Sequence, residues 1–170
     1  DTPSAFSSQY TYKENDAYTT PLVESETLLA GSASVTYRYT YDANNNITQI
    51  RDEANVLLVS YEYDGLNRLI RENIVGGNTT VFKYDKGGNL QFKKVFAYSA
   101  ASGSTVTELL NSSAGSTLNY GYSGDLLTSY NGSGTLEYDN YGNPKKWFKH
   151  GTGNSALKYT LLWGHVSNLT

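Results

Sequence analysis

The sequence contains no cysteine, which excludes disulfides, thiolate metal ligands and cysteine nucleophiles. Methionine is also absent, and proline occurs only 3 times, so rigid spacers are scarce. No apolar run approaches the roughly 18 residues that a membrane-spanning helix needs, and no signal peptide leads the chain. We therefore expect no membrane insertion. From the opening "DTPSAF" and the missing methionine we expect a processed or excised piece of a longer protein.

An excess of positive charge is missing as well. The formal net charge is −3, and the only basic clusters are "QFKKVF" and "NPKKWFKH". Short charge runs of this kind are usually solvated strand faces, here beside aromatic residues. Because a nucleic-acid-binding domain normally presents a basic face, we expect no nucleic-acid partner.

Tyrosine and glycine are the residues that the chain does have in quantity. Its 170 residues, enough for one ordinary domain, include 16 tyrosines and 16 glycines. Tyrosine favours half-buried pleated surfaces, with its ring packed and its hydroxyl in water. Many glycines with few prolines fit many tight turns. This composition indicates an all-β protein.

A short phrase built on tyrosine-aspartate recurs along the chain. Four clear copies read "YTYDANNNIT", "YEYDGLNRLI", "FKYDKGGNLQ" and "LEYDNYGNPK". A fifth copy, from Tyr120, has Ser123 in place of the aspartate, and eroded copies begin at Tyr10 and Leu157. The first three second-position tyrosines follow one another at intervals of 22 and 21 residues. A period in the twenties indicates one supersecondary unit per repeat, too small to bury a face alone.

Each copy reads as a β-hairpin. In the second copy, Tyr61 and Tyr63 alternate with a polar residue, which is the period of a strand. Asp64 stands where a type I turn favours aspartate, because its carboxylate can accept backbone N–H groups of the turn. Asn67 tolerates the left-handed conformation that closes a hairpin with a bulge, and Leu69 begins the returning strand.

The residues shared by the clear copies are assigned a structural role, and no residue is assigned a catalytic, cofactor-binding or metal-binding one. The repeat motif consists of tyrosine pairs, turn aspartates and left-handed turn residues. These are Tyr39, Tyr41, Asp42, Tyr61, Tyr63, Asp64, Asn67, Tyr84, Asp85, Gly88, Tyr138, Asp139 and Gly142.

The hairpins are predicted to form one antiparallel meander. Further turn signals lie at their far ends, in "RDEAN", "VGGNTT" and "NGSGT". We predict a single array over residues 1–170, an all-β, strongly twisted and curved sheet of repeated hairpins. Residues 1–36 match the repeat weakly, and residues 98–117 are expected to contain longer loops.

Metal and acid–base sites have weak support. Counted from Asp42, the segment "DANNNITQIRDE" matches the ligand offsets of a helix-loop-helix calcium site, but position six is Ile47 where glycine is required. The turn asparagines are better explained as turn formers. The recurring aspartates would line up along a sheet edge and not converge on one site, as paired-carboxylate catalysis needs. His150 and His165 have no nucleophile or ligand pattern beside them.

Carbohydrate binding is the more serious alternative. Tyrosine and tryptophan faces stack on sugar rings, and Asn or Asp side chains bond sugar hydroxyls; the chain is rich in all of them. The same tyrosines would also serve simply to cover a sheet. A glycan-binding module predicts an exposed row of tyrosine rings, whereas a hydrolase predicts a cleft with two carboxylates close together.

These repeated phrases resemble the RHS/YD-repeat family of bacterial repeat-containing proteins. The resemblance rests on "YTYDANNNITQI", "YEYDGLNRLIREN", "FKYDKGGNLQFKK", "LTSYNGSGTLEYDNYGNP" and "LKYTLLWGHVSNLT", which cover residues 37–170. It implies a ribbon of β-hairpins that spirals into a hollow shell in full-length members. In toxin members the shell encloses a C-terminal toxic domain and is closed by a self-cleaving segment, and this chain has neither.

The resemblance therefore implies a non-catalytic slice of a repeat shell, from a secreted or wall-associated bacterial protein. The implied partners are the remainder of the parent shell and its enclosed effector domain. Exposed end strands also predict self-association, and glycans are the partners under the alternative reading.

Overall fold

The structure is a computed structural model that describes residues 6–14, 18–131, 136–148 and 158–160. Its elements in chain order are β1 (Phe6–Glu14), β2 (Thr19–Ala30), β3 (Ala33–Tyr41), β4 (Ile47–Asp52), β5 (Leu57–Tyr63), β6 (Leu69–Ile74), β7 (Asn78–Tyr84), β8 (Leu90–Ala97), α1 (Tyr98–Ala101), α2 (Val106–Asn111), β9 (Ser116–Ser123), β10 (Leu126–Tyr130), β11 (Glu137–Tyr138), β12 (Pro144–Phe148) and β13 (Lys158–Thr160). Neither described helix is long and apolar enough to cross a membrane.

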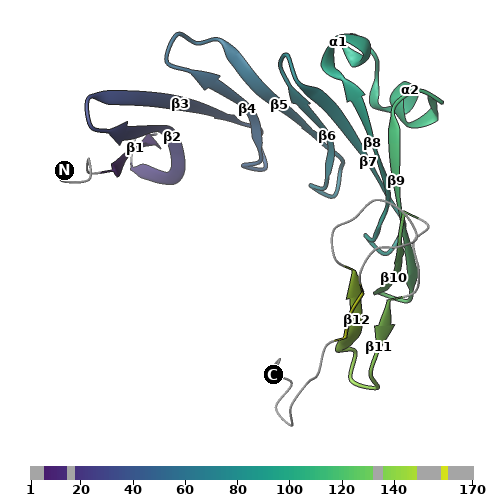
Figure 1. The fold of residues 1–170 in the computed structure, drawn as a ribbon. Helices are drawn as coiled ribbons and strands as arrows, with labels where there is room; N and C mark the ends of the chain where they lie inside the picture. Colours follow the sequence, from purple (N-terminus) through teal and green to yellow (C-terminus); the bar gives the residue numbers. More distant parts are fainter. Residues whose placement is uncertain (1–5, 15–17, 132–135, 149–157, 161–170) are drawn as a thin grey trace. The chain divides into compact units, whose positions relative to one another are not determined.

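Strand order follows chain order throughout (Figure 1). A ten-stranded sheet runs from β1 to β10, and a three-stranded sheet contains β11, β12 and β13. The strands from β1 to β7 pair antiparallel with their neighbours, as in β3 with β4 and β5 with β6. The predicted all-β antiparallel meander of hairpins is confirmed.

The chain divides into two compact units. One unit comprises Asp1–Val81 and Val95–Gly115, and the other comprises Phe82–Lys94 and Ser116–Thr170. No feature of the sequence indicates this division. One array over residues 1–170 stays a prediction.

Across β4, β5 and β6 the register places a row of apolar residues on one face of the sheet. Ile50 of β4 pairs with Tyr39 on one side and Val59 on the other, and Val59 pairs with Ile74. The alternate positions, which point to the opposite face, carry polar residues. Those residues run across four strands as Gln49, Ser60, Asn73 and Thr79.

A small core lies where two helices meet the strands, within the segment expected to contain loops. Val81, Phe96, Ala101 and Leu109 are buried together. Helix α2 starts with a capping box, in which the Thr105 hydroxyl accepts the backbone N–H of Glu108 and the Glu108 carboxylate accepts the backbone N–H of Thr105.

The guanidinium of Arg71 connects these helices to β6. It donates to the backbone carbonyls of Ser104 (2.8 Å) and Ala101 (3.2 Å), and to the Oδ1 of Asn73 (2.9 Å). Glu62 completes the set with an ion pair of 3.2 Å. Arg71 is only 9% exposed, so its charge is neutralised and bonded inside the protein, as burial requires.

Gly115 marks the end of this helical segment. Its φ is +84°, and a Cβ there would lie 2.7 Å from the carbonyl oxygen of Val95 and 2.8 Å from the ring of Phe96. A side chain would collide with both groups. Glycine is therefore needed here for space as well as for backbone conformation.

Candidate functional site

The recurring turn has one geometry, shown by the turn at Asp64. The backbone N–H of Asp64 donates to the carbonyl of Arg68 (2.9 Å), and the N–H of Asn67 donates to the carbonyl of Asp64 (3.0 Å). Asn67 has a φ of +59°, and the strand register shifts just before Tyr63. This is a type I turn closed by a left-handed residue and a bulge.

The same backbone bonds recur at four other aspartates. In each, the aspartate N–H reaches the carbonyl four residues on, and the N–H three residues on reaches the aspartate carbonyl. Those turns begin at Asp42, Asp52, Asp85 and Asp139. Asp52 lies in the far-end turn "RDEAN", so β4 has the same type of aspartate turn at both of its ends.

The left-handed positions are occupied by asparagine or glycine throughout. Among the expected ones, Asn67 has a φ of +59°, Gly88 of +94° and Gly142 of +83°. Asn45 and Asn55 have φ of +66° and +65° in their own turns. These two residue types adopt this conformation most readily.

In the turns at Asp42, Asp64, Asp85 and Asp139, both oxygens of the carboxylate are bonded within the turn. Oδ1 of Asp64 accepts the backbone N–H groups of Leu66 (2.9 Å) and Arg68 (3.0 Å). Its Oδ2 accepts Nε of Arg68 at 2.7 Å, with Nη2 also at 2.7 Å. In the turns at Asp42, Asp85 and Asp139, an asparagine side chain takes the place of the arginine. Its Nδ2 donates to Oδ2 of the aspartate, at 3.0, 3.1 and 3.0 Å respectively.

These bonds hold the carboxylates in their charged form. The pKa of Asp64 is lowered first by the backbone N–H of Arg68, and the pKa of Asp85 first by the backbone N–H of Asn89. For Asp42 and Asp139 the side-chain amides of Asn46 and Asn143 lower the pKa most. A general acid needs a raised pKa and a proton to donate. Because these carboxylates have lowered pKa values and are already bonded, they are suited to anchoring a turn and not to proton transfer.

Neighbouring turns also contact each other. Oδ1 of Asn67 accepts the Nδ2 groups of both Asn44 and Asn46, each at 3.0 Å. The residue that closes one hairpin therefore bridges to the turn of the previous hairpin. The sequence predicts roles for these asparagines only within their own turns. It does not predict this bond between repeats.

A second connection between repeats comes from the tyrosine at the second position of each copy. The hydroxyl of Tyr41 donates to the carbonyl of Val23 at 2.6 Å, and that of Tyr63 to the carbonyl of Ile47 at 2.9 Å. In the second unit, the hydroxyl of Tyr138 donates to the carbonyl of Leu127 at 2.7 Å. The prediction that tyrosine hydroxyls face water is wrong for these residues.

The carbonyl acceptors follow a rule. Val23 pairs with Tyr12, Ile47 pairs with Tyr41, and Leu127 pairs with Tyr122. Each tyrosine thus donates to the residue that pairs with the second-position tyrosine of the preceding copy. We call the series Tyr41, Tyr63 and Tyr138, with their acceptors, the tyrosine ladder.

Burial adjusts the chemistry of the tyrosines. It raises the pKa of Tyr41 and Tyr63, and also that of Tyr122, where a hydrogen bond from the backbone of Leu90 opposes the rise. Tyr39, at the first position of its copy, donates instead to Glu26 at 3.1 Å. Burial and then this carboxylate raise the pKa of Tyr39 to about 12. These phenols stay protonated at neutral pH.

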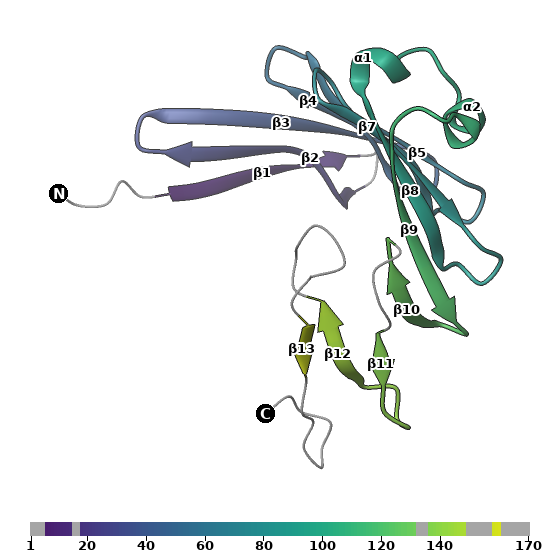
Figure 2. The same ribbon diagram turned by 45° about the vertical axis from the view of Figure 1, so that its right-hand side comes forward.

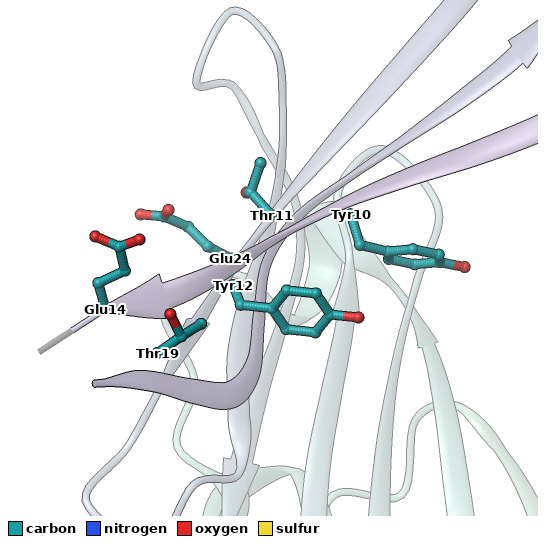
Figure 3. Close-up of a pocket in the computed structure, with 6 residues that line it drawn as sticks. All are labelled: Tyr10, Thr11, Tyr12, Glu14, Thr19 and Glu24. Carbon is teal, nitrogen blue, oxygen red and sulfur yellow. The ribbon is translucent and has the colours of Figure 1, made fainter.

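An open pocket of about 560 Å³ lies along β1 and β2, lined by Tyr10, Thr11, Tyr12, Glu14, Thr19 and Glu24 (Figure 3). The rings of Tyr10 and Tyr12 project to the same side of the strand, while the carboxylates of Glu14 and Glu24 extend away from them. The two acids are therefore not arranged around the rings. The pocket is lined by two tyrosine rings and by polar side chains, and its two carboxylates do not converge.

The residues from Asp42 to Glu53 that match the ligand spacing of a calcium site do not form a binding loop. Asp42 and Glu53 lie beyond opposite ends of β4, because the segment between them is a hairpin strand. Nδ2 of Asn46 donates to Asp42, and the Thr48 hydroxyl bonds that of Thr40. In the described ranges, no cluster of three or more His, Asp or Glu could hold a metal ion. His150 and His165 lie outside the described residues.

Comparison with known proteins places the fold. Residues 41–73 match the family model described as RHS Repeat. The structure is similar to the Photorhabdus luminescens Tc holotoxin pore with a mutated TccC3, at 15% identity and a TM-score of 0.60. It is also similar to a TcdB2-TccC3-Cdc42 crystal structure, at 14% identity and a TM-score of 0.60. No curated protein matches the sequence.

The two similarities cover 96% of this chain but only 10% of each of those chains. At this identity they establish the fold. The family match adds the sequence evidence, because it spans the segment from Tyr41 through β4, β5 and β6 that contains the turns at Asp42, Asp52 and Asp64. Residues 41–73 therefore contain an RHS repeat, and the whole chain has the fold of those structures.

Proposed function

We propose that the chain is a non-catalytic structural scaffold. It forms a slice of an RHS-repeat shell that, in the whole protein, encloses or presents a C-terminal effector domain. The parent is a secreted or wall-associated protein, and its remaining repeats and its enclosed domain are the partners. The tyrosine pairs, turn aspartates and left-handed residues of the repeat motif are the functional residues in this structural sense.

The tyrosine ladder is the observation that carries this proposal. Its hydroxyls connect one repeat to the next, at Tyr41 to Val23 and Tyr63 to Ile47, and leave no phenol of the ladder free for a substrate. The carboxylates that could act in catalysis are bonded to their own turns. Tyrosines and aspartates that are bonded within and between repeats support the repeat array itself.

The first test is the stability of the chain itself. Tyr63→Phe keeps the ring but removes the hydroxyl that reaches Ile47, so it should lower the free energy of unfolding by about 1 kcal/mol. Tyr141, which is 90% exposed, supplies the matched control. Tyr141→Phe should leave the urea midpoint unchanged. Equal urea midpoints for Tyr63→Phe and Tyr141→Phe would show that the ladder does not stabilise the fold.

The second test uses the full-length parent protein. If the repeats form an enclosing shell, the effector domain should resist trypsin in the wild type. It should become cleavable when Tyr41→Phe and Tyr63→Phe are combined, because two connections between repeats are then lost. An effector domain that is cut equally fast in both proteins contradicts enclosure.

Carbohydrate binding is a second candidate, favoured by one observation. Tyr10 and Tyr12 are 48% and 44% exposed, and their rings lie on the same side of β1 in an open pocket. Adjacent exposed rings are suited to stacking on sugars. Retention on an oligosaccharide array that is lost in Tyr10→Ala, but kept in Tyr12→Phe because its ring is intact, would support a glycan site.

A further inference from the structure

Two arginines face each other across neighbouring strands in the interior of the sheet. Arg38 of β3 pairs directly with Arg51 of β4, so the two side chains lie on the same face. Arg38 is exposed, and neither guanidinium forms an ion pair with a carboxylate of the described residues. Because like charges directly opposite each other destabilise a sheet, the needs of the fold do not explain this pair.

The side chains around the pair are polar but uncharged. Ser25 pairs with Arg38 from β2, and Thr36 and Thr40 are the same-face neighbours of Arg38 along β3. The hydroxyls of these three residues are bonded to other hydroxyls, of serine or threonine side chains. The positive charge of the pair is therefore not offset by these neighbours.

Neutral groups orient the Arg51 guanidinium. Its Nε and Nη2 donate to Oε1 of Gln49 at 3.1 and 3.0 Å, and its Nη1 donates to the carbonyl of Asn55 at 2.8 Å. Other N–H groups of Arg51 stay available, and the Arg38 side chain has no hydrogen-bond partner among the described residues. The pair thus offers oriented donors and uncompensated positive charge, which together suit an oxyanion.

The next hairpin carries an equivalent arginine on the same face. Gln49 and Arg51 follow the turn aspartate Asp42 by seven and nine residues, and Arg71 and Asn73 follow Asp64 by the same intervals. In each case the arginine Nε donates to the amide oxygen of its partner. The face is shared, because Gln49 pairs with Ser60 and Ser60 with Asn73.

The use that the fold makes of Arg71 indicates what the Arg38–Arg51 pair binds. Arg71 donates to backbone carbonyls of the segment that contains α1 and α2, and Glu62 supplies the carboxylate that offsets its charge. That segment contacts β6, and Figure 2 shows β3 beside β4 with the two helices farther along the sheet. At β3 and β4 the described chain supplies neither the segment nor the carboxylate.

We propose that Arg38 and Arg51 form a docking site for an acidic polypeptide segment, in which an Asp or Glu carboxylate accepts N–H groups from both guanidinium groups. The precedent of Arg71 favours a polypeptide, because an arginine of this face already binds chain carbonyls. Charge complementarity requires the partner to bring the carboxylate, because the pair has no equivalent of Glu62. The inference goes beyond the proposed scaffold function and does not depend on it.

A titration of the whole chain with a blocked peptide of four glutamates, at low ionic strength, tests the docking. NMR shifts should appear in the Nε–H signals of Arg38 and Arg51 and in the amides of β3 and β4. Combining Arg38→Gln with Arg51→Gln should weaken binding about tenfold. The charge-matched control combines Lys83→Gln with Lys86→Gln, two exposed lysines, and should leave the affinity unchanged. No shift in β3 and β4, or equal losses in the two double variants, would overturn the proposal.

Two further probes separate the carboxylate from the polypeptide. A blocked peptide of four glutamines has the same backbone without the charge and should not bind. Inorganic phosphate has the charge without backbone carbonyls and should bind more weakly than the glutamate peptide at the same ionic strength. Equal affinity for phosphate would show a general anion site and would refute a polypeptide partner. Equal affinity for the glutamine peptide would refute the role of the carboxylate.

The single substitution Arg38→Gln distinguishes a binding role from a structural one. It removes one of two like charges that face each other, so the urea midpoint of the chain should stay the same or rise. Affinity for the glutamate peptide should nevertheless fall. A lowered midpoint would show that Arg38 supports the fold, and it would contradict the assignment of this pair to a partner.

Discussion

A single carboxylate shows how the repeat uses its residues. The Oδ1 of Asp139 accepts the N–H groups of Tyr141 and Asn143, each at 2.9 Å, and its Oδ2 accepts the Nδ2 of Asn143 at 3.0 Å. Three of the roughly four lone-pair positions of this carboxylate are occupied by donors of its own turn. The negative charge therefore stabilises a backbone conformation.

The substitution Asp64→Ala tests this use of the charge. It removes three acceptor contacts to Leu66 and Arg68, so the urea midpoint at neutral pH should fall. Because the pKa of Asp64 is lowered in the folded protein, its contribution is present above the unfolded value of about 3.9 and is lost as the pH falls through the folded value. The difference from wild type should therefore shrink in acid.

Asp125→Ala is the matched control for this measurement. Asp125 is exposed in the turn between β9 and β10, and no hydrogen bond to its side chain is present within the described ranges. Its loss should leave the midpoint unchanged at both pH values. If the two alanine variants behave alike, the carboxylate bonds to the turn contribute nothing measurable.

Tyr39 provides a prediction at alkaline pH. Its pKa of about 12 lies above the ordinary value of 10.0, so its stabilising contribution is present below about pH 10 and is lost as the pH rises through the folded value. Titration followed by NMR of ring-labelled tyrosine should show one phenol ionising near this pH that is missing in Tyr39→Phe. Ionisation of Tyr39 at its ordinary pKa in the folded chain contradicts the prediction.

At the residue scale the turns could be predicted, while the ladder was missed. An aspartate with Asn or Gly three residues later is a local pattern, so the positive φ of Asn67 follows from adjacent residues. The acceptor of Tyr63 is 16 residues away, and strand register decides it. One signal was available: the second position of the copies is always tyrosine, whereas the first is also Phe82 or Leu136.

At the scale of elements, the helices α1 and α2 show what hydrophobic periodicity misses. They have 4 and 6 residues, which is too short to repeat an apolar stripe. The capping pattern of Thr105 and Glu108 was present in the sequence and could have located the start of α2. Nothing local in the sequence indicates that Arg71, 30 residues before Ala101, would hold α1.

The substitution Arg71→Met tests the docking of these helices. It leaves the carbonyls of Ala101 and Ser104 without their donor inside the protein. The free energy of unfolding should fall by about 3 kcal/mol, as for other broken buried charge networks. Hydrogen exchange should accelerate first in residues 98–115.

Arg51→Met is the control for this substitution. Arg51 also bonds a side chain and a carbonyl, those of Gln49 and Asn55, but it is only half-buried. Its replacement should cost clearly less and should leave exchange in residues 98–115 unchanged. Equal losses in the two variants would mean that Arg71 does not hold the helices.

At the scale of the whole molecule, the repeat explains both the success and the limit of sequence analysis. The four clear copies identify a meander, and the same construction extends into the weakly matching residues 1–36, where Tyr12 and Val23 pair like Tyr41 and Ile47. The two compact units were not predictable, since the hairpin phrases continue across their boundary. Local patterns specify each hairpin, whereas packing specifies where the chain divides.

A repeat architecture predicts that damage to one hairpin stays local. Gly88 has a φ of +94° and open space around it, so Gly88→Ala introduces no collision and costs about 1–2 kcal/mol through the left-handed backbone alone. Because each hairpin is connected mainly to its neighbours, exchange protection should fall in β7 and β8 and remain in β3 and β4. Gly65→Ala, in the equivalent turn but without a positive φ, should leave protection everywhere intact. A uniform loss of protection across all strands in Gly88→Ala would show that the chain unfolds as one cooperative body and not as an array.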